Sequence, residues 1–186
     1  PMSSILKVSE IQDPTNGNSA LTIGSTGIVS QGTPVGFSVA LNGGSNQAIS
    51  NQTYTKAQFL YDSTNTRNFD THSGWSNSNY YYTVPAGCGG YWMLSAWAEM
   101  SDLGTQNLMV ISKNTGVGSS GNFLARISEG ESPSSTSNTG MYLSLVANLS
   151  DGDIVKTEVY HNVGSSANLL EVGNYLRSAM QGWRLG

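Results

Sequence analysis

The sequence predicts an all-β protein built as a sandwich or jelly roll, and its glycine content and turn pattern both indicate this class. The 186 residues include 22 glycines, and short apolar runs alternate with stretches of Ser, Thr, Asn and Gly. Regular spacing of short strands and turns is typical of antiparallel sandwiches, and no apolar pattern is long enough to predict a long helix. The length suits one domain with a real core and a short appendage.

The stretch 80–99 is the most informative, because it reads as two strands joined by a corner. Pro85, Gly87, Gly89 and Gly90 interrupt two runs that are rich in aromatic residues. Side chains alternate between the two faces of a strand, and both faces of the second run are apolar. We therefore expect this strand to be buried twice, once in its own core and once against another element or another copy of the chain.

The chain divides by pattern into an N-terminal segment of residues 1–33 and a body of residues 34–186. In the segment, short apolar runs at 5–11 and 20–23 are separated by a turn around Pro14. Strands this short are not stable alone. Two interpretations stay open, a flexible leader or a stem that orders against copies of itself or against a larger assembly.

Strand signals recur throughout the body, separated by polar loops. The longest loops are expected at 62–79 and at 129–140, where the second has no apolar residue at all. The expected strands are 35–41, 54–61, 80–84, 91–99, 107–112, 122–127, 141–147, 154–160 and 177–185.

The composition excludes several function classes. Only 11% of residues are charged and the formal net charge is −4, so no basic surface is available for nucleic acid or anionic lipid. Cys88 is the only cysteine, so no intrachain disulfide can form and packing must hold the fold. No segment suits membrane insertion and no signal peptide is recognisable, so we expect synthesis in a cytoplasm.

Spaced motifs run through the body of the chain. They are, in order, Asn68-Phe69-Asp70, Tyr82-Thr83-Val84-Pro85, Gly89-Gly90-Tyr91, Lys113-Asn114, Leu149 with Gly152-Asp153 and Val155, and Gly182-Trp183-Arg184-Leu185. In order and spacing these motifs resemble the C1q-like domains of the tumour necrosis factor superfamily, over about residues 35–186. Two departures are the corner, which Cys88-Gly89 widens, and the loop 62–79, which is longer and richer in Asn than in the family.

The resemblance implies a ten-stranded jelly roll that forms a compact homotrimer. On the family's pattern, the trimer interface of the central strand would consist of Trp92, Leu94 and Ala96, facing the threefold axis. The residues expected in the sandwich core are Phe37, Tyr82, Val84, Tyr91, Met93 and Val155. Burial of three copies of a Trp and a Leu would contribute several kcal/mol per protomer, at roughly 25 cal/mol per Å².

The N-terminal segment has a resemblance of its own. Leu6-Lys7-Val8 with Ile11, followed by Ala20-Leu21-Thr22-Ile23-Gly24, is similar to the opening of virion proteins, especially fibres, in tailed phages of marine bacteria. This match is short. It implies location in a virion, with residues 3–33 attaching the protein to the phage particle.

Few residues are available for catalysis. His72 and His161 are the only histidines, neither has a metal-ligand spacing with Cys88, and no Gly-x-Ser-x-Gly motif is present. We therefore predict no enzymatic activity and no cofactor.

Two weaker predictions concern ligands. Asp151 and Asp153 flank a glycine and could hold calcium, but a turn in which Asp bonds to the backbone accounts for them better, so no metal site is predicted. Trp75 and Tyr80 lie among Asn and Ser residues, where aromatic rings suit sugar faces, and are candidate ligand contacts. The alternative for Trp75 is packing in the core.

The predicted function is that of a non-enzymatic phage structural protein, a trimeric tail fibre or receptor-binding head whose loops contact a host-surface glycan or protein. Two alternatives stay open. One is a capsid decoration or head-fibre protein, and the other is a cellular C1q-like binding module.

Overall fold

The computed structural model describes two compact units, Pro1–Pro34 and Val35–Gly186. The division falls one residue from the boundary expected at 33/34. The described residues are 34–42, 44–101, 106–114, 116–129, 138–171 and 178–185, together with the backbone of 10–12, 19–23 and 29–31.

The N-terminal unit contains a small antiparallel sheet of three strands in the order β1-β2-β3. These strands are β1 (Glu10–Gln12), β2 (Ser19–Ile23) and β3 (Val29–Gln31). The second strand covers the apolar run expected at 20–23. Most of the run expected at 5–11 lies outside the described residues.

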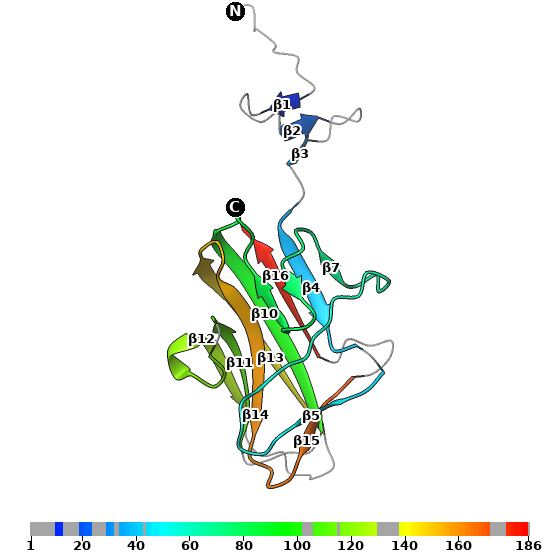
Figure 1. Ribbon diagram of the computed structural model, residues 1–186, viewed down its shortest axis with the longest axis vertical. Coiled ribbons are helices and arrows are strands. Elements are labelled where there is room, and N and C mark those ends of the chain that lie inside the picture. Colours follow the sequence, from blue (N-terminus) through cyan, green and yellow to red (C-terminus); the bar gives the residue numbers. More distant parts are fainter. Residues whose placement is uncertain are drawn as a thin grey trace, which may run out of the picture. The chain divides into compact units, whose positions relative to one another are not determined.

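The larger unit is a sandwich of two antiparallel sheets, which we call the large sheet and the small sheet. The large sheet has the strand order β5-β15-β10-β16-β4-β7, and β13 pairs with the other edge of β10. Figure 1 shows β13, β10, β16 and β4 running side by side. Its strands are β4 (Gly36–Ala40), β5 (Gln47–Ile49), β7 (Phe69–Asp70), β10 (Gly90–Ser101), β13 (Thr139–Leu149), β15 (Ala167–Leu169) and β16 (Ala179–Arg184).

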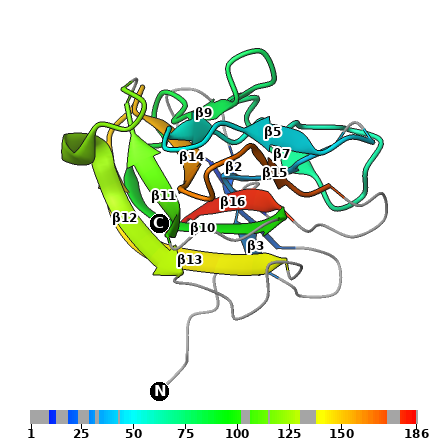
Figure 2. The same ribbon diagram turned by 90° about the horizontal axis from the view of Figure 1, so that it is seen from below.

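The small sheet has the strand order β12-β11-β14-β9-β8, and β6 pairs with β14. Its strands are β6 (Thr55–Lys56), β8 (Trp75–Ser76), β9 (Tyr81–Thr83), β11 (Asn107–Lys113), β12 (Phe123–Glu129) and β14 (Ile154–His161). The two sheets come together at one side, where β12 lies beside β13 (Figure 2). The helical element in the described part of this unit is a short 3-10 turn, η1 (Ser120–Asn122).

A column of aromatic rings joins the two sheets in the core. Phe37 of β4 stacks on Tyr82 of β9 with ring centroids 4.2 Å apart, and Tyr82 lies 5.5 Å from Trp92 of β10. The indole N–H of Trp92 donates to the carbonyl oxygen of Cys88 at 3.1 Å, so this fully buried Trp leaves no unpaired donor. Val84 and Val155 are also buried in this core.

The predicted face assignment of β10 is wrong, because the two faces are exchanged. Trp92, Leu94 and Ala96 are fully buried inside their own chain, whereas Tyr91 is 61% exposed and Met93 is 37% exposed. The inward set continues through two more apolar residues to the end of the strand, while the outward set includes Ser and Glu side chains. Only the face without polar residues can fill a dry core.

The strand predicted at 54–61 is also interrupted, since β6 ends at Lys56 and the chain then crosses between the sheets. The Ala57 amide donates to the Thr157 carbonyl of β14 in the small sheet at 2.9 Å, and the Leu60 amide donates to the Ala40 carbonyl of β4 in the large sheet at 2.8 Å. Between them, the Gln58 amide donates to the side-chain oxygen of Gln47 at 2.7 Å. A side chain therefore replaces the strand partner that the crossing segment lacks.

Substitution of Gly182 by Ala is expected to lower the free energy of unfolding by about 1–3 kcal/mol, the usual cost of overpacking a core. An added Cβ would lie 2.5 Å from Cε1 of Phe37 and 2.9 Å from Cδ2 of Leu94. Urea titration measures the change. Gly140→Ala in β13 of the same sheet is the matched control, because a Cβ there meets nothing within 4 Å. Equal losses in the two variants would contradict this packing.

Candidate functional site

The side of the large sheet that points away from the small sheet carries exposed apolar side chains on the neighbouring strands β10 and β13. We call this surface the outer face. In β10 and β13, Met93 pairs with Val146 and Trp97 pairs with Tyr142. Val146 and Tyr142 are each 59% exposed. Soluble proteins rarely leave apolar side chains gathered on one surface unless something covers it. The outer face is therefore the strongest candidate interaction surface in the described residues.

One polar and one aromatic contact join strands on the outer face. The hydroxyl groups of Ser95 and Ser144, which face each other across β10 and β13, lie 2.9 Å apart. Trp183 of β16 pairs with Met93 on the opposite edge of β10, and the ring of Trp183 packs on Phe69 with centroids 4.6 Å apart. These contacts link neighbouring strands of the large sheet on the outer face.

Reasoning from the sequence missed Tyr142, Val146 and Trp97. A usable signal was present, because β13 alternates between an inward apolar set and an outward set that contains Tyr142 and Val146. The burial of Met141 and Leu149 marks the inward set. The pairing of β10 with β13, which joins the outward sets into one surface, cannot be read from either strand alone.

Asp151 fastens the corner that precedes β10. Its carboxylate accepts the Gly87 amide at 2.7 Å and the Gly89 amide at 2.6 Å. These two backbone hydrogen bonds lower the pKa of Asp151 below its ordinary value of 3.8. The left-handed backbone of Gly87, with a φ of 75°, allows the tight turn that presents both amides.

Asp153 makes a different set of contacts from Asp151. Its carboxylate accepts the Ser150 amide at 2.6 Å and lies 2.5 Å from the ammonium of Lys113. The carboxylates of Asp151 and Asp153 thus bind backbone amides of two different turns. Within the ranges that the structure describes, no group of three or more His, Cys, Asp or Glu residues stands close enough to hold a metal ion.

Trp75 packs against the body of the protein. Its ring stacks on Phe37 with centroids 5.7 Å apart, and its indole nitrogen is buried without a hydrogen-bond partner. An edge of Trp75 still lines a shallow pocket of about 360 Å³ with His72, Tyr81 and Pro85. The Trp75 side chain therefore mainly packs against the core through Phe37.

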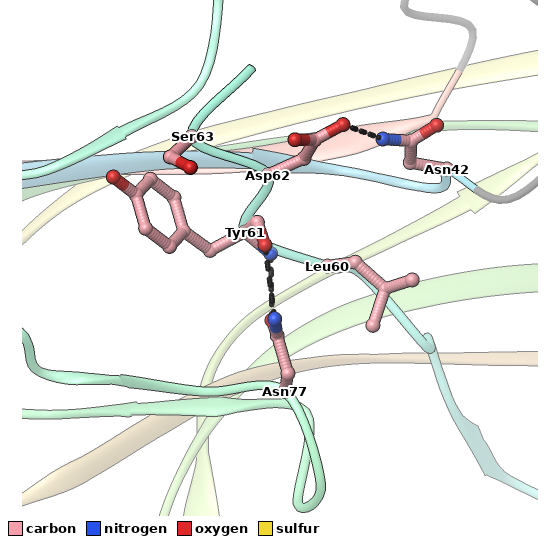
Figure 3. A pocket seen from close by; sticks show the side chains of 6 residues that line it. All are labelled: Asn42, Leu60, Tyr61, Asp62, Ser63 and Asn77. Atoms are coloured by element: carbon pink, nitrogen blue, oxygen red, sulfur yellow. Dashed lines mark hydrogen bonds between the residues drawn. The ribbon is translucent and has the colours of Figure 1, made fainter. Parts of the chain in front are cut away.

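Tyr80 lines a different pocket from Trp75. It lines a pocket of about 210 Å³ beside Gln47 and Gln58, and this pocket shares Asn42 and Leu60 with a second pocket of about 440 Å³. Figure 3 shows the second pocket, with Asn77 on one side and Asn42 and Asp62 on the other. The sequence offered no signal for this arrangement, because its residues come from separate loops.

The buried charged groups of the small sheet serve the fold. Lys156 donates to the carbonyl oxygens of Asn114 and Gly116 and lies 3.3 Å from the Glu158 carboxylate. Glu158 also accepts the Ser112 hydroxyl at 2.7 Å. The ammonium group thus has three partners, and this buried pair ties the loop after β11 to β14.

The two histidines make separate contacts within the fold. The buried His161 has Nε2 2.9 Å from the Ile49 carbonyl oxygen, and the exposed His72 has Nδ1 2.9 Å from the Thr71 hydroxyl.

Burial, with smaller effects of Asp70 and Cys88, raises the pKa of the Tyr82 phenol. No helix in the described part of the chain is both long and apolar enough to cross a bilayer.

No protein-family profile and no curated protein sequence matches this chain. Solved structures do match it. They include Eiger TNF from S. frugiperda (11% identity, TM-score 0.57, covering 83% of this chain and 94% of that one) and murine APRIL at pH 8.0 (14%, 0.56, 82% and 100%). The globular domain of the zebrafish complement 1qA protein also matches, at 16% identity and a TM-score of 0.54, covering 83% of this chain and 98% of that one.

These identities are low, so the likeness concerns the fold alone. It confirms the predicted fold class, an all-β jelly-roll sandwich of the C1q and tumour necrosis factor type.

Removal of the Asp151 carboxylate is expected to destabilise the protein in a pH-dependent way. A carboxyl group whose pKa is lowered by folding stabilises the fold fully above its ordinary value of 3.8, and this contribution is lost as the pH falls through the lowered pKa. Urea unfolding of the native protein and of Asp151→Ala should therefore differ clearly at about pH 6 and converge towards about pH 2. A difference that stays constant over this range would contradict the corner contacts.

Proposed function

We propose that this protein is a non-enzymatic, homotrimeric binding protein in which the outer face of the large sheet is the contact between subunits. The observation that carries the proposal is the row of exposed apolar side chains on paired strands, including Tyr91, Met93, Tyr142 and Val146. Further copies of the same chain are suitable partners, because apolar side chains on one copy can be buried against apolar side chains of its neighbours around a threefold axis. The number three comes from the resemblance of the sequence motifs to C1q-like domains.

Burial of this face would favour association. Complete burial of one large, fully exposed apolar side chain contributes about 1.5–3 kcal/mol, and the four side chains named above are 37–61% exposed in a single chain, so each would contribute roughly half of that. Part of this gain is offset by the loss of translational and rotational freedom. The interface first predicted at Trp92, Leu94 and Ala96 is not part of the proposal, because those side chains are already buried within one chain.

We further propose that the protein belongs to a phage particle, as a tail fibre or receptor-binding head. Residues 3–33 would attach it to the virion, and the loops of the larger unit would contact the host surface. The support is the resemblance of the N-terminal segment to phage virion proteins and the separation of the chain into two compact units near Pro34. A capsid decoration protein would share these features.

Substitution of Val146 by Asp is expected to convert the trimer into a monomer, because three carboxylates would be desolvated in one interface at a cost of several kcal/mol. Light scattering should give a mass near three times 19.7 kDa for the native protein and near 19.7 kDa for the variant. Val117→Asp is the matched control, since Val117 is 49% exposed on the connection between β11 and β12 of the small sheet, and it should keep the native mass. A monomeric native protein would refute the proposal, as would an unchanged mass of Val146→Asp.

The virion role predicts that an antibody against this protein labels intact phage particles in electron micrographs. Label on the tail would support the receptor-binding assignment, and label on the capsid would support decoration. A purified chain without residues 3–33 should fail to bind particles that lack the protein, whereas the full chain should bind them. Unlabelled particles would exclude the role altogether.

A further inference from the structure

Two adjacent pockets on the larger unit together form what we call the groove, and Tyr80 lines the smaller of them. They adjoin because Asn42 and Leu60 line both of them. Their volumes are about 440 Å³ and 210 Å³, together in the range of small-molecule sites. Leu60, which lines both pockets, lies where the chain crosses between the two sheets, and its amide bonds to the Ala40 carbonyl of the large sheet.

The side-chain amides of the groove are held in fixed orientations by the main chain. Asn77 accepts the Tyr61 amide at 2.7 Å and donates to the Tyr61 carbonyl at 2.9 Å, as Figure 3 shows. Gln47, only 8% exposed, donates to the Lys56 carbonyl at 2.8 Å and accepts the Gln58 amide at 2.7 Å. A side-chain amide has two N–H donors and two acceptor sites, so each of these two keeps capacity for a ligand after its main-chain bonds are made.

Tyr80 is held at the groove in a strained backbone conformation. Its φ is 55°, a value that bulky residues rarely adopt, and the turn that imposes it is closed by the Tyr80 amide donating to the Ser76 carbonyl at 2.7 Å. Strain of this kind costs of order 1–3 kcal/mol and persists mainly at functional sites. Glycine would adopt this conformation without cost, so a gain elsewhere is needed to explain a tyrosine here.

The charge of the groove favours a neutral ligand. No Lys or Arg lines either pocket, and Asp62 is the one charged residue among the lining residues. Its carboxylate already accepts the Thr64 amide at 2.8 Å, the Thr64 hydroxyl at 2.7 Å and the Asn42 amide at 2.9 Å. Lys56 does not line the pockets, and its ammonium lies over the rings of Tyr80 and Tyr81, 5.9 Å and 5.7 Å from their centroids.

We propose that this groove binds an uncharged oligosaccharide. Tyr61 and Tyr80 supply ring faces for the apolar sides of two sugar units, and the oriented amides of Gln47 and Asn77 hydrogen-bond to the hydroxyl groups between them. An anionic glycan would meet the Asp62 carboxylate without a compensating cation in the lining. This inference deepens the proposed binding role by naming the ligand class, but the groove shares no lining residue with the outer face.

The test is binding of the full-length protein to an immobilised panel of neutral oligosaccharides built from glucose, galactose and mannose, with sialylated and sulfated counterparts. We expect neutral members to bind and charged ones not to. Tyr61→Ala and Tyr80→Gly should each weaken binding about tenfold, as expected for the loss of one ring contact. Tyr80→Gly removes the ring while relieving the backbone strain, so a distorted backbone would not explain its loss of binding.

Tyr81→Ala is the matched control, because Tyr81 contacts the same lysine but does not line the groove. It should bind as the native protein does. The inference is overturned if no neutral oligosaccharide binds, if only charged ones bind, or if Tyr61→Ala and Tyr80→Gly bind as tightly as the native protein. Light scattering on the same samples separates the two proposals, since a trimer that binds no sugar refutes only the groove and a monomer that binds sugar refutes only the interface.

Discussion

The alternation of side chains along β10 is the constraint on which the rest of the structure depends. Trp92 and Leu94 point into the sandwich and are fully buried, so Tyr91 and Met93 must point out of it. The inward set joins the aromatic column that holds the two sheets together. Because the strand is apolar on both sides, the packing that stabilises one copy leaves an apolar surface on its outside.

The other features of the larger unit follow from the need to support this strand. Asp151 fastens the corner before it, and the Trp92 indole is satisfied by the Cys88 carbonyl in the same corner. The chain must also pass from the small sheet to the large sheet near Leu60, and between its backbone bonds to the two sheets the Gln58 amide bonds to the side chain of Gln47. Leu60 of that crossing lines both pockets of the proposed groove, so one topological requirement contributes to a surface with fixed polar groups.

The sequence predicted the fold class correctly because the order of its strands and turns is local information. It also indicated that both faces of β10 carry apolar side chains. The pattern of the C1q-like family, however, assigned the buried and the outward face the wrong way round. Every second residue from Trp92 to Met100 is apolar, whereas the alternate set contains Ser95 and Glu99. This contrast indicates the buried face of β10 correctly. The groove could not be predicted, because Asn42, Tyr61 and Asn77 meet only through the crossing of the chain.

The central claim is that the outer face is covered in the assembled protein, and hydroxyl-radical footprinting of the native sample tests it most directly. Tyr91, Met93 and Tyr142 are well exposed in a single chain, at 61%, 37% and 59%. If copies meet on this face, these side chains should be strongly protected from oxidation, while Tyr80 in its open groove should react. Oxidation of Tyr91, Met93 and Tyr142 at the rates expected from their exposure in one chain would contradict the account.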